Sequence, residues 1–289
     1  MLGAGDPVLL LHGLGGSGAY WGGVFDSLAA TGRLLAPDLP GFGGSPPAAA
    51  FTADAQALAV LGALSLLGVD RPAVVAGHSV GALVGLRMAA LSPQSVRAVV
   101  AIAPPLFTSS DHARRHFDSA GLLERAVTRE QPLAMVLHWL LVGAARATDG
   151  WVAALARPDL PVAVARDGLR SDRTAYRGTV RDLLLNGSAL DLIAACPVPV
   201  KILAGTEDRV SDLALLDDLS VRFPHVAVRL VAGADHHLPL LAPEECLEAI
   251  RNCIRPGLFR ADAADGAWEA HPRADEAIGA AVIATSEGG

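Results

Sequence analysis

The stretch "VVAGHSVGALVG", residues 74–85, places a serine on a short polar turn between two apolar segments. The apolar run before it is typical of a buried strand, and the Ala-, Leu-, Val- and Gly-rich run after it is typical of a helix. Gly77 and Gly81 remove side chains where the backbone must pass close to itself in a sharp strand-to-helix turn. Ser79 is therefore either a nucleophile held on this turn or a residue that caps the helix. The nucleophile interpretation requires a base and an acid elsewhere in the chain.

Six short apolar runs follow one another along the chain, and segments of helical length separate most of them. The runs are continuous rather than alternating, which is typical of strands in a parallel sheet covered on both faces. The sequence thus predicts an α/β fold with a doubly wound, mostly parallel sheet and a site at the carboxyl ends of its strands. The expected strands are 7–13, 33–38, 73–79, 98–104, 200–206 and 226–233, and the expected helices lie near 18–30, 52–68, 81–92, 211–222 and 243–253.

One interval, residues 105–190, contains no convincing strand pattern. Helical patterns rich in Arg, Ala and Leu fill it, and its segment 132–145 is apolar nearly all round, as in a core helix or the wall of a pocket. We therefore expect a helical cap at 105–190, inserted into an α/β core formed by residues 1–104 and 191–255. Weak periodicity predicts a loosely attached C-terminal extension at 256–289.

Composition disfavours several classes of protein. Of the 289 residues, 52% are hydrophobic, which is enough for a substantial core, and the net charge of −7 with no basic stripe disfavours nucleic-acid binding. The N-terminus lacks a secretory signal pattern, and no apolar stretch reaches the roughly 18 to 20 residues that a membrane span needs. Phosphate-binding and metal-ligand spacings are weak or absent, so we expect no cofactor and no metal.

The cysteines favour a cytoplasmic location. Cys196, Cys246 and Cys253 form an odd set without metal-ligand spacing, and the last two lie seven residues apart on one face of a predicted helix. They are expected to be small buried hydrophobic side chains rather than a disulfide framework. The sequence predicts a soluble cytoplasmic protein with a small-molecule substrate, either a monomer or a homodimer.

A base for Ser79 is expected just after the last predicted strand. The segment "LVAGADHHLPL" supplies His236 and His237 there, in a polar interruption between apolar runs. Two adjacent histidines cannot both face the same centre, so one is the candidate base and the other a wall or surface residue.

An acid that orients the base is expected after the preceding strand. The segment "LAGTEDRV" supplies Glu207 and Asp208 there, of which Asp208 is preferred. Asp111, the first carboxylate after the strand that ends near 103, is the alternative. The order Ser79, Asp208, histidine is the order expected for a nucleophile on a strand-to-helix turn of this kind.

Backbone amides that stabilise an oxyanion are expected at the end of the first strand. The segment "LLLHGLGGSGAYW" places several glycines there, which leave the loop free to direct its N–H groups. The amides of Leu14 and Val80 are the candidate pair. Taken alone, the same glycines also fit a simple strand-to-helix turn.

Together these motifs resemble an α/β-hydrolase-fold enzyme of the capped esterase, haloperoxidase and C–C hydrolase type, over about residues 7–254. The resemblance rests on "LLLHGLGGSGAYW", "APDLPGFGGS", "VVAGHSVGALVG", "LAGTED" and "VAGADHHLPLLAPEE", in the family's order. It implies a catalytic role for Ser79, selects Asp208 as the acid and His236 as the base, and makes 38–45 a structural turn. Asp235 stands where the family commonly has a glycine, so it is either a turn residue or a charge that raises the pKa of the base.

The resemblance also implies a chemistry. Relatives that hydrolyse epoxides or haloalkanes have an aspartate at the nucleophile position, whereas Ser79 favours acyl chemistry. We expect a serine-dependent hydrolase that acts through an acyl-enzyme on a carboxylic ester or related acyl substrate with a hydrophobic moiety. The alternatives are elimination, cyclisation or acyl transfer in a biosynthetic pathway, and a ligand-binding, receptor-like protein with little turnover. The expected pocket residues are His12, Gly13, Trp21, His78, Leu133, Leu137, His138, Leu141 and His237.

Overall fold

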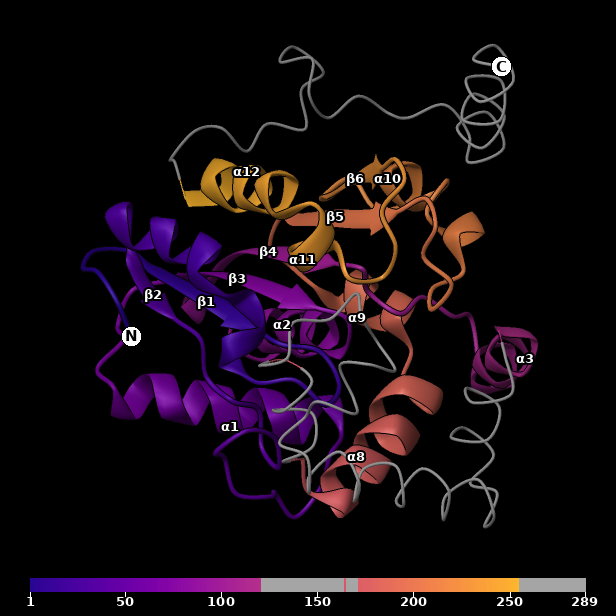
Figure 1. Cartoon of the computed structure of the whole chain (residues 1–289), viewed down its shortest axis with the longest axis horizontal. Coiled ribbons are helices and arrows are strands. Elements are labelled where there is room, and N and C mark those ends of the chain that lie inside the picture. Colours follow the sequence, from indigo (N-terminus) through magenta and orange to yellow (C-terminus); the bar gives the residue numbers. More distant parts are fainter. Residues whose placement is uncertain (121–163, 165–170, 255–289) are drawn as a thin grey trace.

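The computed structural model describes residues 1–120, 164 and 171–254, and within them a six-stranded sheet forms the centre of the molecule (Figure 1). All neighbouring strands are parallel, in the spatial order β2-β1-β3-β4-β5-β6. The predicted doubly wound α/β fold is confirmed. The strands are β1 Pro7–Leu11, β2 Arg33–Leu35, β3 Ala73–His78, β4 Val96–Ile102, β5 Val200–Gly205 and β6 Val226–Val231.

Helices cover both faces of this sheet, which explains why its strands are continuously apolar. Every residue of β1, β3 and β5 is buried. Side chains of one face pack on α1, α2 and α9, and those of the other face pack on the 3-10 segment η2 and on α12. In Figure 1, α1 and α2 lie below the sheet and α12 lies above it. These elements are α1 Ala53–Leu66, α2 Val80–Leu91, α9 Ala189–Ala195, η2 Gly23–Ala30 and α12 Pro243–Ile254.

Two expected helices are shorter or tighter than predicted. The segment 18–30 forms two 3-10 segments, η1 Gly18–Trp21 and η2, because Gly22 adopts a φ of 62° and ends the first of them. The segment 211–222 forms only the 3-10 turn η5 Leu213–Leu215 and the four-residue helix α10 Leu219–Arg222. The other expected helices match α1, α2 and α12 within two residues.

The regular elements in the described part of the chain between β4 and β5 are all helical. This part contains α3 Ser110–Ala120, α8 Arg173–Thr179, the π-helical segment η4 Val180–Leu185 and α9. Most of the expected cap (121–163 and 165–170) and the expected extension lie outside the described residues, so these two domain assignments stay predictions. In Figure 1, the strand arrows point to the right, α3 lies to the right of their tips, and α8 lies below the sheet. Among the described helices, none has the length and apolar character needed to cross a membrane.

Candidate active site

Ser79 lies on a strained turn between the last residue of β3 and the first of α2. Its φ is 53° and its ψ is −121°, a conformation that non-glycine residues rarely adopt. A Cβ on Gly77 would lie 2.3 Å from the carbonyl oxygen of Gly81, and a Cβ on Gly81 would lie 2.4 Å from the carbonyl oxygen of Leu11. The two glycines are therefore required by close backbone contacts on both sides of the serine, and the serine hydroxyl is held above the end of the sheet.

His236 lies between Ser79 and Asp208. Its Nε2 is 3.0 Å from Ser79 Oγ, and its Nδ1 is 2.9 Å from Asp208 Oδ2. When Nδ1 carries the hydrogen and donates it to the carboxylate, Nε2 is the acceptor for the serine hydroxyl. Both distances lie within the range required for transfer of a proton from the hydroxyl to the imidazole. The three groups thus have the geometry of a nucleophile, a base and an orienting acid.

The Asp208 carboxylate is fixed by backbone donors at the end of β5. Its side chain is fully buried, and Oδ1 accepts hydrogen bonds from the amides of Val210 at 2.7 Å and Ser211 at 3.4 Å. These bonds leave Oδ2 directed at His236. The Ser211 hydroxyl donates to the carbonyl of Pro104 at 2.5 Å, which joins the acid-bearing loop to the chain that leaves β4.

The alternative residues for the base and the acid have other environments. Glu207 is exposed, and its backbone amide donates to the carbonyl of Ala234. Asp111 is exposed in the first turn of α3. The side chain of Asp235 accepts a hydrogen bond from the amide of His237 at 2.7 Å, so Asp235 shapes the turn that carries both histidines.

The glycine-rich loop after β1 contacts the nucleophile turn. A Cβ on Gly13 would lie 3.2 Å from Ser79 Cβ, so this loop passes directly beside the serine. Leu14 follows Gly13, and Val80 is the first residue of α2, so both proposed oxyanion amides belong to residues adjacent to this contact. The amide of Ser79 itself donates to the carbonyl of Ile102 at 2.9 Å.

Asp38 fixes the far end of the same loop. Its two carboxylate oxygens accept hydrogen bonds from the amides of Gly18 at 2.7 Å and Gly44 at 2.8 Å. The hydroxyl of Ser45 donates to the Asp38 carbonyl, and this closes the turn expected over 38–45. The predicted structural turn is therefore present, and it supports the glycine-rich loop from behind.

Three of the expected pocket residues are buried in the protein interior. His12, Trp21 and His78 are only 0%, 3% and 3% exposed, so their side chains are packed against other parts of the protein, and their expected role as pocket residues stays a prediction. The imidazole of His12 donates from Nδ1 to the carbonyl of Gly13 at 2.8 Å and accepts the amide hydrogen of Leu39 at Nε2. Trp21 packs edge-on against Phe25 in the core, with ring centroids 5.0 Å apart. The remaining expected residues are Gly13 and His237, which are close to the site, and Leu133, Leu137, His138 and Leu141, which lie outside the described residues.

Sequence reasoning did not single out Tyr20, which is buried beside His78 and His237. Its ring stacks on His78 with centroids 4.8 Å apart and an interplanar angle of 18°. Its hydroxyl lies 3.2 Å from Nδ1 of His237. Burial raises the pKa of the Tyr20 phenol, so the group stays neutral and keeps its hydrogen. The only signal in the sequence is an aromatic pair directly after a glycine-rich loop.

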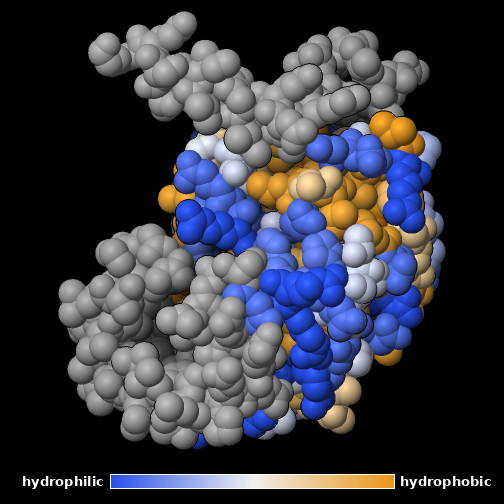
Figure 2. All heavy atoms as spheres, turned by 90° about the vertical axis from the view of Figure 1, so that its right-hand side faces the viewer, coloured by the Kyte–Doolittle hydropathy of each residue, from blue (hydrophilic) through white to orange (hydrophobic). Residues whose placement is uncertain are grey.

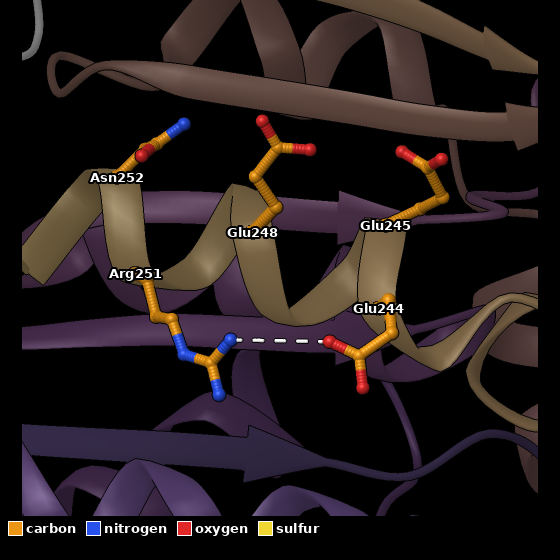
Figure 3. Close-up of a pocket in the computed structure, with 5 residues that line it drawn as sticks. All are labelled: Glu244, Glu245, Glu248, Arg251 and Asn252. Atoms are coloured by element: carbon orange, nitrogen blue, oxygen red, sulfur yellow. Dashed lines mark ion pairs between the residues drawn. The ribbon is translucent and has the colours of Figure 1, made fainter.

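A surface hollow along α12 lies apart from the residues around Ser79. Figure 3 shows its lining, and Glu244 and Arg251 form a 4.0 Å ion pair on one side of the helix. None of the residues around Ser79 lines it. In the described part of the chain, no group of three or more His, Cys, Asp or Glu side chains is placed to hold a metal ion. The hollow along α12 is lined by Glu244, Glu245, Glu248, Arg251 and Asn252.

Known proteins similar to this chain include enzymes named as hydrolases and part of a synthase. At 29% identity, 92% of the chain aligns with 12% of the polyketide synthase ThaQ of Burkholderia thailandensis, so the chain spans a small part of that protein. The 2-(acetamidomethylene)succinate hydrolase of Mesorhizobium japonicum is 30% identical over 266 residues, which are 87% of this chain and 89% of that enzyme.

Structural and family comparisons agree with these alignments. The crystal structure of an E-2-(acetamidomethylene)succinate hydrolase superposes with a TM-score of 0.64 at 25% identity, over 88% of this chain and 92% of that one. The sequence profile described as "alpha/beta hydrolase fold" matches residues 6–243. Because this match includes all six strands and covers most of the protein, the chain belongs to the alpha/beta hydrolase fold family.

Proposed function

We propose that this protein is a serine-dependent hydrolase that acts on a carboxylic ester or a related acyl substrate with a hydrophobic moiety. The observation that carries the proposal is the pair of contacts that His236 makes, 3.0 Å to Ser79 Oγ and 2.9 Å to Asp208 Oδ2. A neutral alcohol is a poor nucleophile, and an adjacent imidazole oriented by a carboxylate is a common way to activate it.

In the first half of the reaction, Ser79 Oγ attacks the carbonyl carbon of the substrate while His236 Nε2 accepts the hydroxyl proton. The amides of Leu14 and Val80 stabilise the oxyanion of the tetrahedral intermediate. Collapse of this intermediate breaks the bond to the leaving group, which takes the proton from His236. The acyl group remains on Ser79 as an ester.

Water completes the reaction in the second half. His236 accepts a proton from the attacking water, a second tetrahedral intermediate forms, and its collapse returns that proton to Ser79 Oγ as the carboxylic acid leaves. Throughout, Asp208 holds Nδ1–H and stabilises the transient imidazolium.

The surface around the carboxyl ends of the strands supports a partly hydrophobic substrate. Figure 2 views this side of the molecule, and apolar side chains gather in its upper half while polar ones predominate below. An apolar surface beside a few convergent polar groups is the usual composition of a small-molecule site.

Acyl transfer is a second candidate, and the match to part of a protein named as a polyketide synthase favours it. It would use the same acyl-enzyme and differ only in the group that accepts the acyl chain. The products separate the two candidates, because hydrolysis releases a free acid and transfer yields an acylated acceptor.

A fluorophosphonate probe tests the proposal. The wild-type protein is expected to gain the mass of one probe adduct, and Ser79→Ala is expected to gain none. Ser92→Ala is the matched control, since Ser92 ends the same helix and its hydroxyl lies 2.8 Å from that of Ser95. Absence of an adduct on folded wild-type protein, or equal labelling of Ser79→Ala, would contradict the proposal.

A further inference from the structure

The ring of His78 contacts three parts of the candidate active site at once. His78 is the last residue of β3, so it directly precedes the nucleophile. Its Nε2 lies 2.8 Å from the carbonyl oxygen of His236, the residue that carries the candidate base. Its Nδ1 lies against the glycine-rich loop, because a Cβ on Gly13 would come within 2.8 Å of it.

Tyr20 holds this ring from its other side. The stacked Tyr20 and His78 rings are nearly parallel, and the Tyr20 hydroxyl reaches His237, the neighbour of the candidate base. The pair therefore contacts both residues of the His236–His237 dipeptide, one through a backbone carbonyl and the other through a side chain. Asp235 adds a third restraint on the same turn through the amide of His237.

The protonation of His78 follows from this environment. A carbonyl oxygen only accepts hydrogen bonds, so Nε2 must carry the hydrogen that it donates to His236. Burial and the neighbouring imidazole of His236 lower the pKa of His78, which keeps its ring neutral with a single N–H. Nδ1 is then a buried acceptor with no partner among the described residues.

An unpartnered buried acceptor destabilises a protein. An apolar side chain at position 78 would avoid this penalty and still fill the space beside Tyr20. The feature that an apolar side chain lacks is the N–H group directed at the carbonyl of His236.

We propose that His78 is a positioning residue, which, with Tyr20 stacked on it, holds the backbone of His236 at the distance from Ser79 that proton transfer requires. This inference rests on the proposed function, because it assigns to His236 the role of base. His78 acts through His236 and does not itself contact the reacting atoms.

Two substitutions separate the donor from the bulk of the side chain. His78→Leu removes the N–H and fills similar space, whereas the side-chain amide of His78→Gln extends far enough to donate to the same carbonyl. His225→Leu is the matched control, since Nε2 of His225 also bonds a backbone carbonyl, that of Ile193 at 3.1 Å, at the opposite end of the sheet. Thermal unfolding identifies any variant that does not fold.

The first measurement is the rate at which the fluorophosphonate probe labels Ser79. In His78→Leu, a misplaced base is expected to slow the labelling of Ser79 about 10- to 100-fold. His78→Gln is expected to recover most of the rate, and His225→Leu to label like wild type. Equal labelling of His78→Leu and wild type, or equal losses in His78→Leu and His78→Gln with both folded, would overturn the inference.

The second measurement does not depend on reactivity. In ¹⁵N-histidine-labelled protein, the imidazole proton between His236 and Asp208 is expected as a downfield resonance, assigned by its loss in His236→Gln. It should persist in His78→Gln and be lost or shifted in His78→Leu. If wild type is not labelled by the probe but this resonance depends on His78 as expected, the proposed function fails and the positioning role stands. A resonance unchanged in His78→Leu overturns the positioning role.

Discussion

Gly81 and Leu11 come so close that no side chain fits between them. A Cβ on Gly81 would lie 2.4 Å from the carbonyl oxygen of Leu11 and 2.6 Å from that of His12. The first turn of α2 therefore packs directly on the end of β1, and this contact sets the height of Ser79 above the sheet. Backbone carbonyls cannot move aside as a flexible side chain can.

Two glycine-to-alanine substitutions in helices should therefore have opposite effects on stability. In α1, a Cβ on Gly62 would have no atom of the described residues within 4 Å, so Gly62→Ala is expected to raise the free energy of unfolding by about 1 kcal/mol. Gly81→Ala is expected to lower it by about 1–3 kcal/mol because the methyl group overpacks the contact with Leu11. Urea denaturation measures both changes, and a stable Gly81→Ala variant would contradict the close approach.

Asp208→Asn should abolish most of the activity while preserving the fold. An amide in this place can donate to Nδ1 and so favours the imidazole tautomer with its hydrogen on Nε2, where it cannot accept the proton of Ser79. We expect kcat to fall about 10⁴-fold. Glu207→Gln is the control, since this neighbouring side chain is exposed. The test is to measure kcat of both variants on one activated ester. A similar fall in kcat for Asp208→Asn and Glu207→Gln would exclude Asp208 as the acid.

Replacement of Lys201 should reveal the effect of a buried charge. Lys201 is buried in β5, and desolvation lowers the pKa of its ammonium group. Between the folded pKa and the usual value near 10.5, the unfolded chain binds more protons, so this group makes stability rise with pH in that window. The free energy of unfolding of Lys201→Met is expected to exceed that of wild type at pH 7, by a margin that shrinks toward pH 10.5. Denaturation curves at several pH values test this, and a margin that grows with pH would contradict it.

The cysteines should be unreactive in the native protein. All three are buried, and burial raises the pKa of Cys246 to about 12 and that of Cys196 and Cys253 to about 11. At pH 8 about a thousandth of each thiol or less is thiolate, the reactive form. We expect Ellman's reagent to titrate no thiol rapidly in native protein and three in guanidinium chloride. Rapid reaction of one thiol per molecule of native protein would show that this thiol is accessible.

The sequence was sufficient to predict the sheet and the residues that meet at its edge. Apolar runs long enough for strands, with a serine between Gly77 and Gly81, predict a buried parallel sheet that ends in a turn. The structure then places Asp208 and His236 beside Ser79. Spacing along the chain carried this information, because parallel strands bring their carboxyl ends to one edge of the sheet.

The direction of the side chains could not be predicted in the same way. His12, Trp21 and His78 lie near the site in sequence, yet Trp21 packs on Phe25 in the core and His78 bonds the backbone carbonyl of His236. A motif locates the backbone of a residue but not the partners of its side chain, which depend on long-range contacts. The stack of Tyr20 on His78 joins residues 58 positions apart in the sequence, and the bond from His78 to the His236 carbonyl joins residues 158 positions apart.

The topology also separates the residues of the proposed proton transfer from the helical stretch between β4 and β5. Ser79, Asp208 and His236 come from the segments that follow β3, β5 and β6, whereas the helical stretch between β4 and β5 contributes none of them. Within that stretch, α9 packs against the core and the carbonyl of Pro104 accepts a hydrogen bond from Ser211, so we expect substitutions that spare these contacts to leave the positions of Ser79, Asp208 and His236 unchanged. Sequence changes elsewhere in that stretch are therefore expected to alter which substrate is accepted before they alter the proposed chemistry.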